Sequence, residues 1–473
     1  MKVLYVRANF PKFSETFIVE EIVGLRRRGH EVRVVGAFGE LERLHHKIFE
    51  ERVFDFVEYD GRVVGAPIDF DAFVRSRSRN YVNRKFRAKI FFKNPLHLSR
   101  MEVLYDFVKN HVRLDAPRET LRKIKSVFRD ARRVNNIWIA LHQSRPRKAF
   151  IPDVIHCPFA TIHNLVYARQ ISENNGGIPY TVSFRAKDLY AMYDPEPEIR
   201  RDLIATCSKV LTIAKFNRIA LGERYPHLKD APVVHSCIDA TYFAPSREIA
   251  KTKGKIVAVG RLIEKKGFEY LIDACWNLKQ TGRAFRCLII GEGPLQDQLE
   301  ARVRDRGLTD CVKIMGPLVQ GEVKSHLNDA ELFALPCITA EDRNRDILPN
   351  AIKEAMAMAL PVVTFNSNGI TELIEHTVDG LLVEPGSVLS LSNVMASLLD
   401  DESERVRLGG NARARILAEF HRDGETAKLE AQFCEATGLG APGTFGLEED
   451  ISPSHMAPRP SSFPSGQASS LEV

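Results

Sequence analysis

The sequence predicts an α/β protein made of two doubly wound domains, in which helices cover both faces of a parallel sheet. Short, almost continuous apolar runs recur along the chain, and a stretch with helical periodicity follows each of them. Such runs are typical of strands buried on both faces of a parallel sheet. The alternation occurs in both halves of the chain, which indicates two domains. A polar, turn-rich stretch over residues 243–254, "FAPSREIAKTKG", marks their boundary.

The predicted strands follow one another in a regular order. In the first half they are "KVLYVRA", "HEVRVVGAF", "PDVIHCPFA", "PYTVSFRA", "KVLTIA" and "APVVHSCI". In the second half they are "GKIVAVGRL", "RCLIIGEG", "VKIMGPL", "ELFALPC", "PVVTFN" and "GLLVEPG". Two segments break this order. Residues 41–150 are rich in Arg and Lys and are predicted to be a mostly helical insertion, and the Pro-, Ser- and Gly-rich tail over 440–473 is predicted to be disordered.

The bulk composition is that of a globular protein. The chain has 473 residues, of which 44% are hydrophobic and 27% charged, which is enough for two or three domains with their own cores. Its net charge of +6 is too mild to indicate a nucleic-acid partner, and we expect none. The eight cysteines form no CxxC pair and lie mostly in apolar runs, which predicts buried, reduced thiols and no metal.

Two features bear on the location of the protein. The start "MKVLYVRANF" is a poor signal peptide because Arg7 interrupts a very short apolar run, so we expect a cytoplasmic protein. Residues 74–150 hold about twenty Lys and Arg against about five acids, with Phe, Ile and Leu interleaved. This segment is either a solvated helical face or a surface that holds the protein on the anionic inner face of the cell membrane.

The loops that leave the strands are the candidate binding loops, because ligands bind beyond the carboxyl ends of the strands in open α/β sheets. After "GKIVAVG" come Arg261 and, one short loop later, Lys266 ahead of a helix. Two cations beside a helix start predict an anion site, and the alternative is a solvated basic loop. Gly291, Gly293 and Gly316 stand at the next two strand ends, where they either allow a ligand to approach the backbone or make tight turns.

Two carboxylates frame a predicted helix start in "DRNRDILPNAIKEAM". The helix begins at Pro349 or Asn350, so Asp346 lies in the loop before it and Glu354 lies one turn inside it. Carboxylates accept hydrogen bonds from the vicinal hydroxyls of sugars, and the free N–H groups of the helix start can hold a phosphate. The alternative is a charge at the helix start together with a surface glutamate. In "NGITELI", Gly369 either brings backbone amides close to a sugar or makes a turn.

The order of these motifs resembles glycosyltransferase family 4, whose members are retaining enzymes with the two-domain GT-B fold. "GRLIEKKG", "IIGEGP", "DILPNAIKEAMAMALPVV", "NGITELI" and "DGLLVEPG" carry the resemblance, which covers residues 230–420. "FPKFSETF", "VIHCPFA", "IPYTVSFRAKDLY", "VLTIAKFN" and "VVHSCIDATYF" are similar to the branch that makes exopolysaccharides and colanic acid.

The resemblance implies roles for individual residues. Arg261 and Lys266 would hold the donor diphosphate, Glu354 the donor ribose, and Asp346 the transferred sugar. The remaining donor-binding positions would be Gly260, Gly291, Gly293, Met315, Gly316, Leu318, Ile347, Leu348, Pro349 and Asn350, with Met315 to Leu318 meeting the base. The acceptor side would include Ser14, Glu15, Thr16, His156, Arg185, Lys187 and Asp188.

The sequence departs from the family pattern at four motif positions. Asp346 stands where the family usually has Glu, and Ile347 stands where it usually has Gly. Arg185 replaces a histidine that normally lines the cleft. His156 keeps the first histidine of its motif, while Pro158 replaces the second. These changes leave the sugar and the acceptor open.

The resemblance also implies a domain organisation with two domains facing a central cleft. Residues 1–243 would form the acceptor-side domain and 244–420 the nucleotide-sugar-binding domain, and a helix over 421–439 would return to the N-terminal domain. The implied activity is transfer of a sugar, of the hexosyltransferase type, from a nucleoside diphosphate sugar to a growing, lipid-linked glycan. The family needs no metal or other cofactor. A phosphorylase or epimerase with the same fold, and a catalytically silent nucleotide-sugar binder, remain as alternatives.

Overall fold

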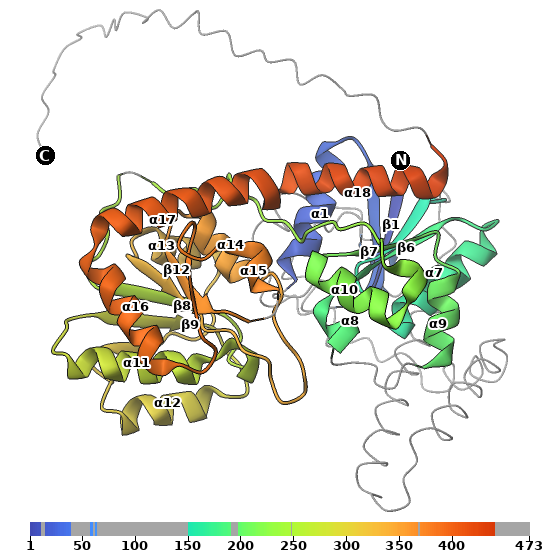
Figure 1. The fold of residues 1–473 in the computed structure, drawn as a ribbon. Helices are drawn as coiled ribbons and strands as arrows, with labels where there is room; N and C mark the ends of the chain where they lie inside the picture. Colours follow the sequence, from blue (N-terminus) through green and yellow to red (C-terminus); the bar gives the residue numbers. More distant parts are fainter. Residues whose placement is uncertain are drawn as a thin grey trace, which may run out of the picture.

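The computed structural model describes residues 1–10, 15–38, 57–59, 62–63, 150–190, 197–246, 248–367 and 369–439. These residues form two α/β domains that lie side by side, and one long helical segment runs along the top of both (Figure 1). Ser14, the tail over 440–473 and most of the basic insertion over 41–150 lie outside the described residues. The predictions made for them therefore stay predictions.

The N-terminal domain is built on a mostly parallel sheet. Its described strands are β1 (Lys2–Phe10), β2 (Glu31–Phe38), β3 (Val57–Tyr59), β4 (Arg62–Val63), β5 (Val154–Cys157), β6 (Tyr180–Phe184) and β7 (Lys209–Thr212), in the order β4-β3-β2-β1-β5-β6-β7. Only β4 runs antiparallel to its neighbour. The helices are α1 (Thr16–Arg27), α7 (Ile162–Asn174), α8 (Ala186–Tyr190), α9 (Glu198–Ala205), α10 (Lys215–Arg224) and the 3₁₀ turn η3 (Pro226–Leu228).

The C-terminal domain holds a second parallel sheet, in the order β10-β9-β8-β11-β12-β13. Its strands are β8 (Lys255–Val259), β9 (Arg286–Ile290), β10 (Val312–Ile314), β11 (Leu332–Ala334), β12 (Val362–Phe365) and β13 (Leu381–Val383). Its helices are η4 (Glu264–Lys266), α11 (Phe268–Gln280), α12 (Gln296–Asp305), α13 (Gln320–Asn328), α14 (Asn350–Ala357), α15 (Ile370–Leu373), α16 (Val388–Asp400), α17 (Glu402–Arg415) and η5 (Ile416–Phe420).

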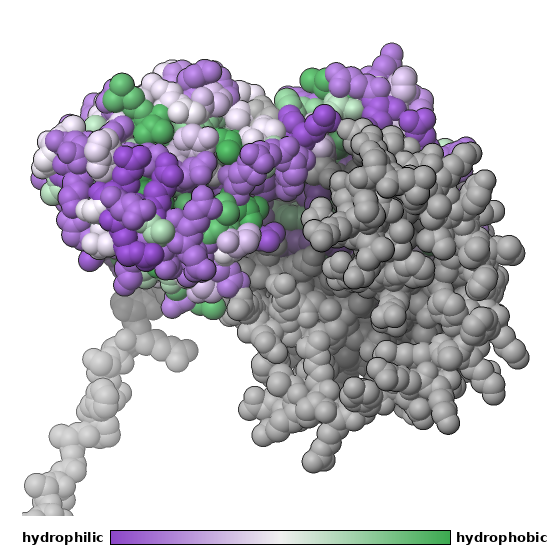
Figure 2. All heavy atoms as spheres, turned by 90° about the horizontal axis from the view of Figure 1, so that it is seen from below, coloured by the Kyte–Doolittle hydropathy of each residue, from purple (hydrophilic) through white to green (hydrophobic). Residues whose placement is uncertain are grey.

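The apolar runs form strands because both faces of each sheet are covered. In β1, Val3 and Tyr5 enter one core cluster, while Leu4 and Val6 enter the cluster on the opposite face. Every residue of β12 is buried. The prediction of two doubly wound parallel sheets is therefore confirmed. The face of the C-terminal domain seen in Figure 2 is mostly hydrophilic, with small, separate apolar groups.

Two local predictions differ from the structure. The run "APVVHSCI" over 231–238 is not a strand but a connection between the domains, with single bridge pairs at Val233 and Ile238. Its peptide groups are shared between β7 and the start of α18, so no continuous ladder forms. Strands β3 and β4 lie inside the segment predicted to be mostly helical, where they extend the sheet beyond β2.

The last helix, α18 (Arg422–Thr437), lies against α1 of the N-terminal domain (Figure 1). Gly24 of α1 allows this close approach, because a Cβ there would lie 2.2 Å from the Thr426 hydroxyl oxygen. Arg422 is buried and forms ion pairs with Glu20 at 2.8 Å and Asp239 at 3.1 Å. In the part of the chain that is described, no helix is both long and apolar enough to cross a membrane.

Candidate active site

The predicted donor and acceptor sides meet at the start of α14. Asn350, the first residue of this helix, donates a hydrogen bond from Nδ2 to the Thr16 hydroxyl at the start of α1, over 3.0 Å. Pro349 is the N-cap, as the fixed φ of proline favours. Since Asn350 belongs to the C-terminal domain and Thr16 to the N-terminal domain, the candidate site lies between the two domains.

The predicted acid Asp346 is held by two adjacent lysines. Its Oδ1 lies 3.0 Å from Lys265 Nζ, and its Oδ2 lies 2.8 Å from Lys266 Nζ. Burial alone would raise the pKa of the Asp346 carboxyl, but the two ammonium groups outweigh it and hold this pKa well below its usual range. Burial alone would lower the pKa of Lys266, whereas Asp346 raises it. This cluster therefore carries one net positive charge.

The two predicted diphosphate ligands have different surroundings. Lys266 is largely buried, and its aliphatic stem packs on Gly260, where a Cβ would lie 3.3 Å from the lysine Cδ and Cε atoms. Arg261 is exposed, and none of the described residues forms an ion pair with it. An exposed guanidinium and a buried ammonium on one loop suit an anionic ligand that enters from solvent.

In the neighbouring loops, close backbone contacts or positive φ angles require glycine at three positions. Gly291 has a φ of +147°, and a Cβ there would lie 1.9 Å from the Gly260 carbonyl oxygen. A Cβ on Gly293 would lie 2.4 Å from the Leu262 carbonyl oxygen. Gly316 has a φ of +73° and accepts a hydrogen bond from Gly291 N at 2.9 Å. The loops after β8, β9 and β10 thus pack backbone on backbone. Beside them, Met315 and Leu318 are half-buried.

The residues before and inside α14 are buried. Ile347 and Leu348 lie in the apolar core, and Glu354 is 8% exposed. Ile347 fits against a glycine of the next loop, since a Cβ on Gly369 would lie 2.4 Å from Ile347 Cγ2 and 3.3 Å from Phe216 Cβ. Ile347, which follows Asp346, therefore makes a packing contact with the "NGITELI" turn in this chain.

The acceptor-side prediction Arg185 is buried in a polar and aromatic cluster. Its Nη2 donates to Glu21 Oε1 at 2.8 Å, and its Nε donates to the Pro158 carbonyl at 2.8 Å. The guanidinium lies over the Phe17 ring, 3.7 Å from the centroid. Burial raises the pKa of Glu21 despite this arginine. Pro158 and Arg185, two departures from the family pattern, are therefore bonded to each other.

The other acceptor-side predictions have contrasting environments. His156 is fully buried, with Nδ1 2.8 Å from the Thr181 hydroxyl, and burial lowers its pKa to about 3, so the ring is neutral. Asp188 is buried and accepts the amides of Ala160 and Arg185 at 3.1 Å each. Lys187 is exposed. His156 and Asp188 are therefore buried residues that support the strand ends. Glu15 is also buried, in a two-contact ion pair with Arg7 at 2.6 and 3.0 Å.

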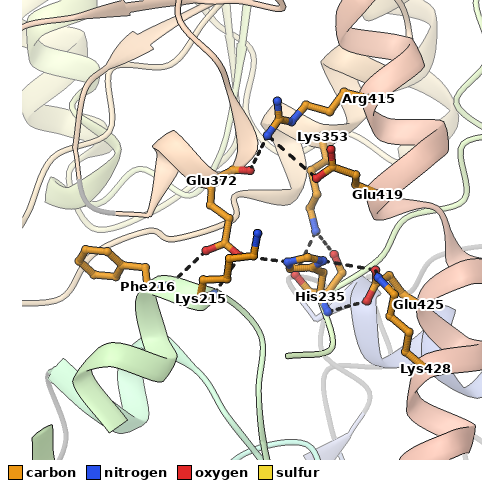
Figure 3. A network of polar contacts seen from close by, with 10 residues as sticks. Lys215, Phe216, His235, Lys353, Glu372, Arg415, Glu419, Glu425 and Lys428 are labelled. Atoms are coloured by element: carbon orange, nitrogen blue, oxygen red, sulfur yellow. Dashed lines mark hydrogen bonds and ion pairs between the residues drawn. The ribbon is translucent and has the colours of Figure 1, made fainter. Parts of the chain in front are cut away.

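A polar network also joins the two domains (Figure 3). Glu372, on α15, accepts the amides of Lys215 at 2.8 Å and Phe216 at 3.2 Å, which are the first two residues of α10. His235, in the interdomain connection, lies with Nε2 3.0 Å from Glu372 and Nδ1 3.3 Å from Glu425 of α18. Glu372 thus accepts the free amides at the start of α10, because the N-cap residue Ala214 has no side chain that could do so.

Lys353 forms a second link in the same network. It is fully buried on α14, next to Glu354, and its ammonium donates to the carbonyl and hydroxyl oxygens of Ser236. Burial lowers the pKa of Lys353 to about 8. The sequence did not point to the roles of Lys353, His235, Lys265 or Glu372. The one sequence feature that bears on them is the absence of a capping side chain before α10, which requires an acceptor from elsewhere.

Known proteins are similar in sequence to part of this chain. Residues 241–415 match the family model described as glycosyl transferases group 1. The chain carries a glycosyltransferase group 1 domain. It is 42% identical over 168 residues to the amylovoran biosynthesis glycosyltransferase AmsK of Erwinia amylovora, which covers 36% of this chain and 41% of that protein. It is 36% identical over 187 residues to the putative colanic acid biosynthesis glycosyltransferase WcaL of Escherichia coli, with 39% and 46% covered. These matches span less than half the length of either relative.

Solved structures resemble the chain over both domains. A glycosyltransferase from Rickettsia africae superposes with a TM-score of 0.60 at 14% identity, over 92% of this chain and 98% of that one. The Anabaena protein Alr3699/HepE, solved in complex with UDP and glucose, superposes with a TM-score of 0.59 at 16% identity, over 91% and 98%. The glycosyltransferase group 1 domain is therefore one half of a GT-B fold, as the sequence predicted.

Proposed function

We propose that the chain is a retaining glycosyltransferase of the hexosyltransferase type, which moves a sugar from a nucleoside diphosphate sugar to a growing glycan. The observation that carries the proposal is the pairing of Lys266 with Asp346 at 2.8 Å, beside the start of α14 in the glycosyltransferase group 1 domain. A buried cation and a carboxylate at the same point suit a ligand that is part phosphate and part sugar. The names of the curated relatives support the same class of reaction.

In this proposal the C-terminal domain binds the donor. Lys266 and Arg261 hold the diphosphate and stabilise the charge that develops on it as the sugar leaves. Glu354 binds the ribose, Asp346 binds the sugar that is transferred, and the backbone over 315–318 meets the base. The Anabaena structure with UDP and glucose supports a nucleotide sugar as the donor class.

The proposed reaction needs no dedicated protein base. The bond between the anomeric carbon and the diphosphate oxygen breaks, and the acceptor hydroxyl forms its new bond on the same face of the sugar. The departing phosphate oxygen takes the proton of that hydroxyl. Asp346 and Glu354 then bind and orient the donor, unlike the acid and base carboxylates of glycoside hydrolases. This scheme follows the family resemblance and uses no metal or other cofactor.

The proposed acceptor is a lipid-linked glycan in exopolysaccharide or cell-surface polysaccharide synthesis, bound by the N-terminal domain. The amylovoran and colanic acid relatives support a polysaccharide pathway. A peripheral position on the inner face of the cell membrane rests on the basic composition of residues 74–150 alone. Co-sedimentation with anionic vesicles at low and at high salt tests it, and failure to bind at low salt would reject it.

A donor screen tests the proposed activity. The purified full chain is incubated with nucleoside diphosphate sugars, with and without a lipid-linked glycan, and the released nucleoside diphosphate is measured. We expect release that requires the acceptor and persists in the presence of a chelator. Sugar phosphate formed from inorganic phosphate would indicate a phosphorylase, an epimerised donor would indicate an epimerase, and donor binding without turnover would indicate a silent binder. Each of these outcomes overturns the proposal.

A further inference from the structure

Lys265 is a second cation on the same carboxylate, and the proposed function gives it no role. Each oxygen of Asp346 has its own lysine, with Lys265 Nζ 3.0 Å from Oδ1 and Lys266 Nζ 2.8 Å from Oδ2. Both lysine side chains are largely buried, 18% and 12% exposed. Two separately held oxygens fix the orientation of a carboxylate as well as its position.

Three further contacts tie the loop of Asp346 to the turn that carries the lysines. We call residues 338–346 the acid loop and η4 (Glu264–Lys266) the lysine turn. The Ile338 amide donates to the Lys265 carbonyl at 3.0 Å, and the Glu341 amide donates to Glu264 Oε1 at 2.9 Å. Lys265 Nζ also donates to Asn344 Oδ1 at 3.3 Å. Lys265 thus contacts the acid loop at its first residue, at Asn344 and at its last residue, Asp346.

The lysine turn is itself fixed in place. Gly267, which follows it, has a φ of +64°, a conformation that suits glycine. A Cβ there would lie 2.0 Å from the Pro336 carbonyl oxygen, so the turn is packed directly against the strand exit that leads to the acid loop. The lysine turn therefore has little room to move away from the strand exit without losing this contact.

A donor diphosphate would compete with Asp346 for Lys266. A phosphate and a carboxylate cannot both take the same short, buried contact, so Lys266 has to share its ammonium or leave Asp346 when the donor binds. Lys265 can keep its own oxygen of the carboxylate throughout. We propose that Lys265 is a positioning residue that holds Asp346 in place while Lys266 turns to the donor diphosphate. The inference rests on the proposed function, in which Asp346 meets the transferred sugar.

The charges around Asp346 favour separate roles for the two lysines, with Lys265 on the carboxylate and Lys266 on the diphosphate. Lys265 and Lys266 are the cations that face it, Cys337 lies with Sγ 3.7 Å from Oδ2, and Glu354 acts on Lys266. Burial raises the pKa of the Asp346 carboxyl and the two lysines lower it. If Lys266 is engaged by phosphate and Lys265 is missing, the buried carboxylate has no full counter-ion, and its pKa should rise toward the range where it takes up a proton.

Four variants test the proposal through kinetics. Lys265→Ala is compared with Lys265→Arg, with Lys266→Ala and with Lys279→Ala, which removes an exposed lysine from a pair with Asp310. We expect Lys265→Ala to bind bare nucleoside diphosphate within about twofold of wild type, to lower kcat by about tenfold, and to shift the acidic limb of the pH–rate profile upward by about one pH unit. Lys265→Arg should restore most of kcat, because it keeps the charge. Lys279→Ala should behave as wild type.

Two kinetic results would overturn the proposal. A wild-type kcat and pH profile in Lys265→Ala would remove the role of Lys265. A loss of nucleoside diphosphate affinity equal to that of Lys266→Ala would make Lys265 a phosphate ligand instead. Hydrogen exchange of the ligand-free chain provides a readout that needs no turnover. Lys265→Ala should speed exchange at the Ile338 and Glu341 amides, and unchanged exchange would contradict the proposal even if no donor were ever found. An inactive wild type with the expected exchange would instead count against the proposed function alone.

Discussion

Asn350 and Thr16 are hydrogen-bonded across the interface between the two domains, over 3.0 Å. The family resemblance implies that Asn350 lies on the donor side and Thr16 on the acceptor side. Their contact joins the two halves of the candidate site directly at the start of α14. A donor that reaches the start of α14 therefore has to replace this bond or fit beside it.

Removing the buried cation should weaken nucleotide binding. We expect Lys266→Ala to reduce the affinity for bare nucleoside diphosphate by about 1.5–3 kcal/mol, the usual range for a hydrogen bond to a charged group. Arg261→Ala should cost less, because its guanidinium is exposed and solvent screens it. Calorimetric titration of both variants measures the difference, with Lys279→Ala as the control. Equal affinity in wild type and Lys266→Ala would show that this lysine does not bind the diphosphate.

The two acids should behave differently on substitution. The sequence alone predicts that Asp346→Asn leaves the affinity for bare nucleoside diphosphate nearly unchanged. The structure changes this prediction, since Asp346 Oδ2 lies 2.8 Å from Lys266 Nζ and would compete with a diphosphate for that ammonium group. Asp346→Asn should therefore raise that affinity, while it lowers sugar transfer. Glu354→Gln should lower both, because sugar donor and bare nucleotide share the ribose. Calorimetric titration with nucleoside diphosphate, together with turnover assays, distinguishes the two variants. If Asp346→Asn transfers sugar as fast as wild type, Asp346 does not bind the transferred sugar.

The interdomain network should make stability depend on pH. Burial alone would lower the pKa of His235, but its bonds to Glu372 and Glu425 outweigh this and raise it. The contribution of His235 to the free energy of unfolding is therefore complete below its pKa in the unfolded chain, about 6.5. It is lost as the pH rises through the pKa of His235 in the folded protein. Burial would raise the pKa values of Glu372 and Glu425, but hydrogen bonding, from His235 above all, lowers them, so their contribution is lost as the pH falls through their folded values.

The contribution of the His235 network should thus be largest between about pH 4.5 and 6.5. We expect the difference in Tm between wild type and His235→Gln to be greatest near about pH 5.5 and to shrink as the pH rises through the raised pKa of folded His235. Thermal unfolding across this range measures it. A difference that stays constant with pH would mean that the imidazole acts here without its positive charge.

A methyl group at the interface should disturb the site. In Gly369→Ala the new Cβ would lie 2.4 Å from Ile347 Cγ2 and 3.3 Å from Phe216 Cβ, so one of these buried contacts has to move. We expect the free energy of unfolding to fall by about 1–3 kcal/mol, as for other overpacked cores. Gly410→Ala is the matched control, because no atom lies within 4 Å of its Cβ position, and on α17 it should stabilise by about 0.5–1 kcal/mol. Denaturant unfolding of both variants decides the matter, and equal stability would contradict the packing argument.

Most of the fold could be predicted because strand-forming runs are local. Both sheets follow from such runs, for example "YTVSF" in the N-terminal domain and "VVTF" in the C-terminal domain, in which every residue is buried. The prediction of a strand at "APVVHSCI" was wrong because apolar composition does not determine the hydrogen-bond partners of the peptide groups. Here these partners are divided between β7 and the start of α18. Strands β3 and β4 depend on pairing at a sheet edge, which local composition does not encode.

The site could be predicted only in part. The spacing of Asp346, Asn350 and Glu354 around a helix start is local, and the structure places them there. The second lysine on Asp346 was missed, because adjacent Lys265 and Lys266 resemble a solvated basic turn. Glu372 looked like an ordinary acid in the first turn of a short helix, while its partners at α10 are more than 150 residues away in the chain. Contacts between domains of this kind leave no local pattern.

The measurement that tests the account most directly is the anomeric configuration of the transferred sugar. The purified chain is incubated with the donor that supports acceptor-dependent release, and the new linkage is assigned by NMR. The account predicts one new glycosidic bond with the same anomeric configuration as in the donor, formed by wild type and strongly reduced in Lys266→Ala. An inverted linkage, or free sugar as the only product, would contradict it.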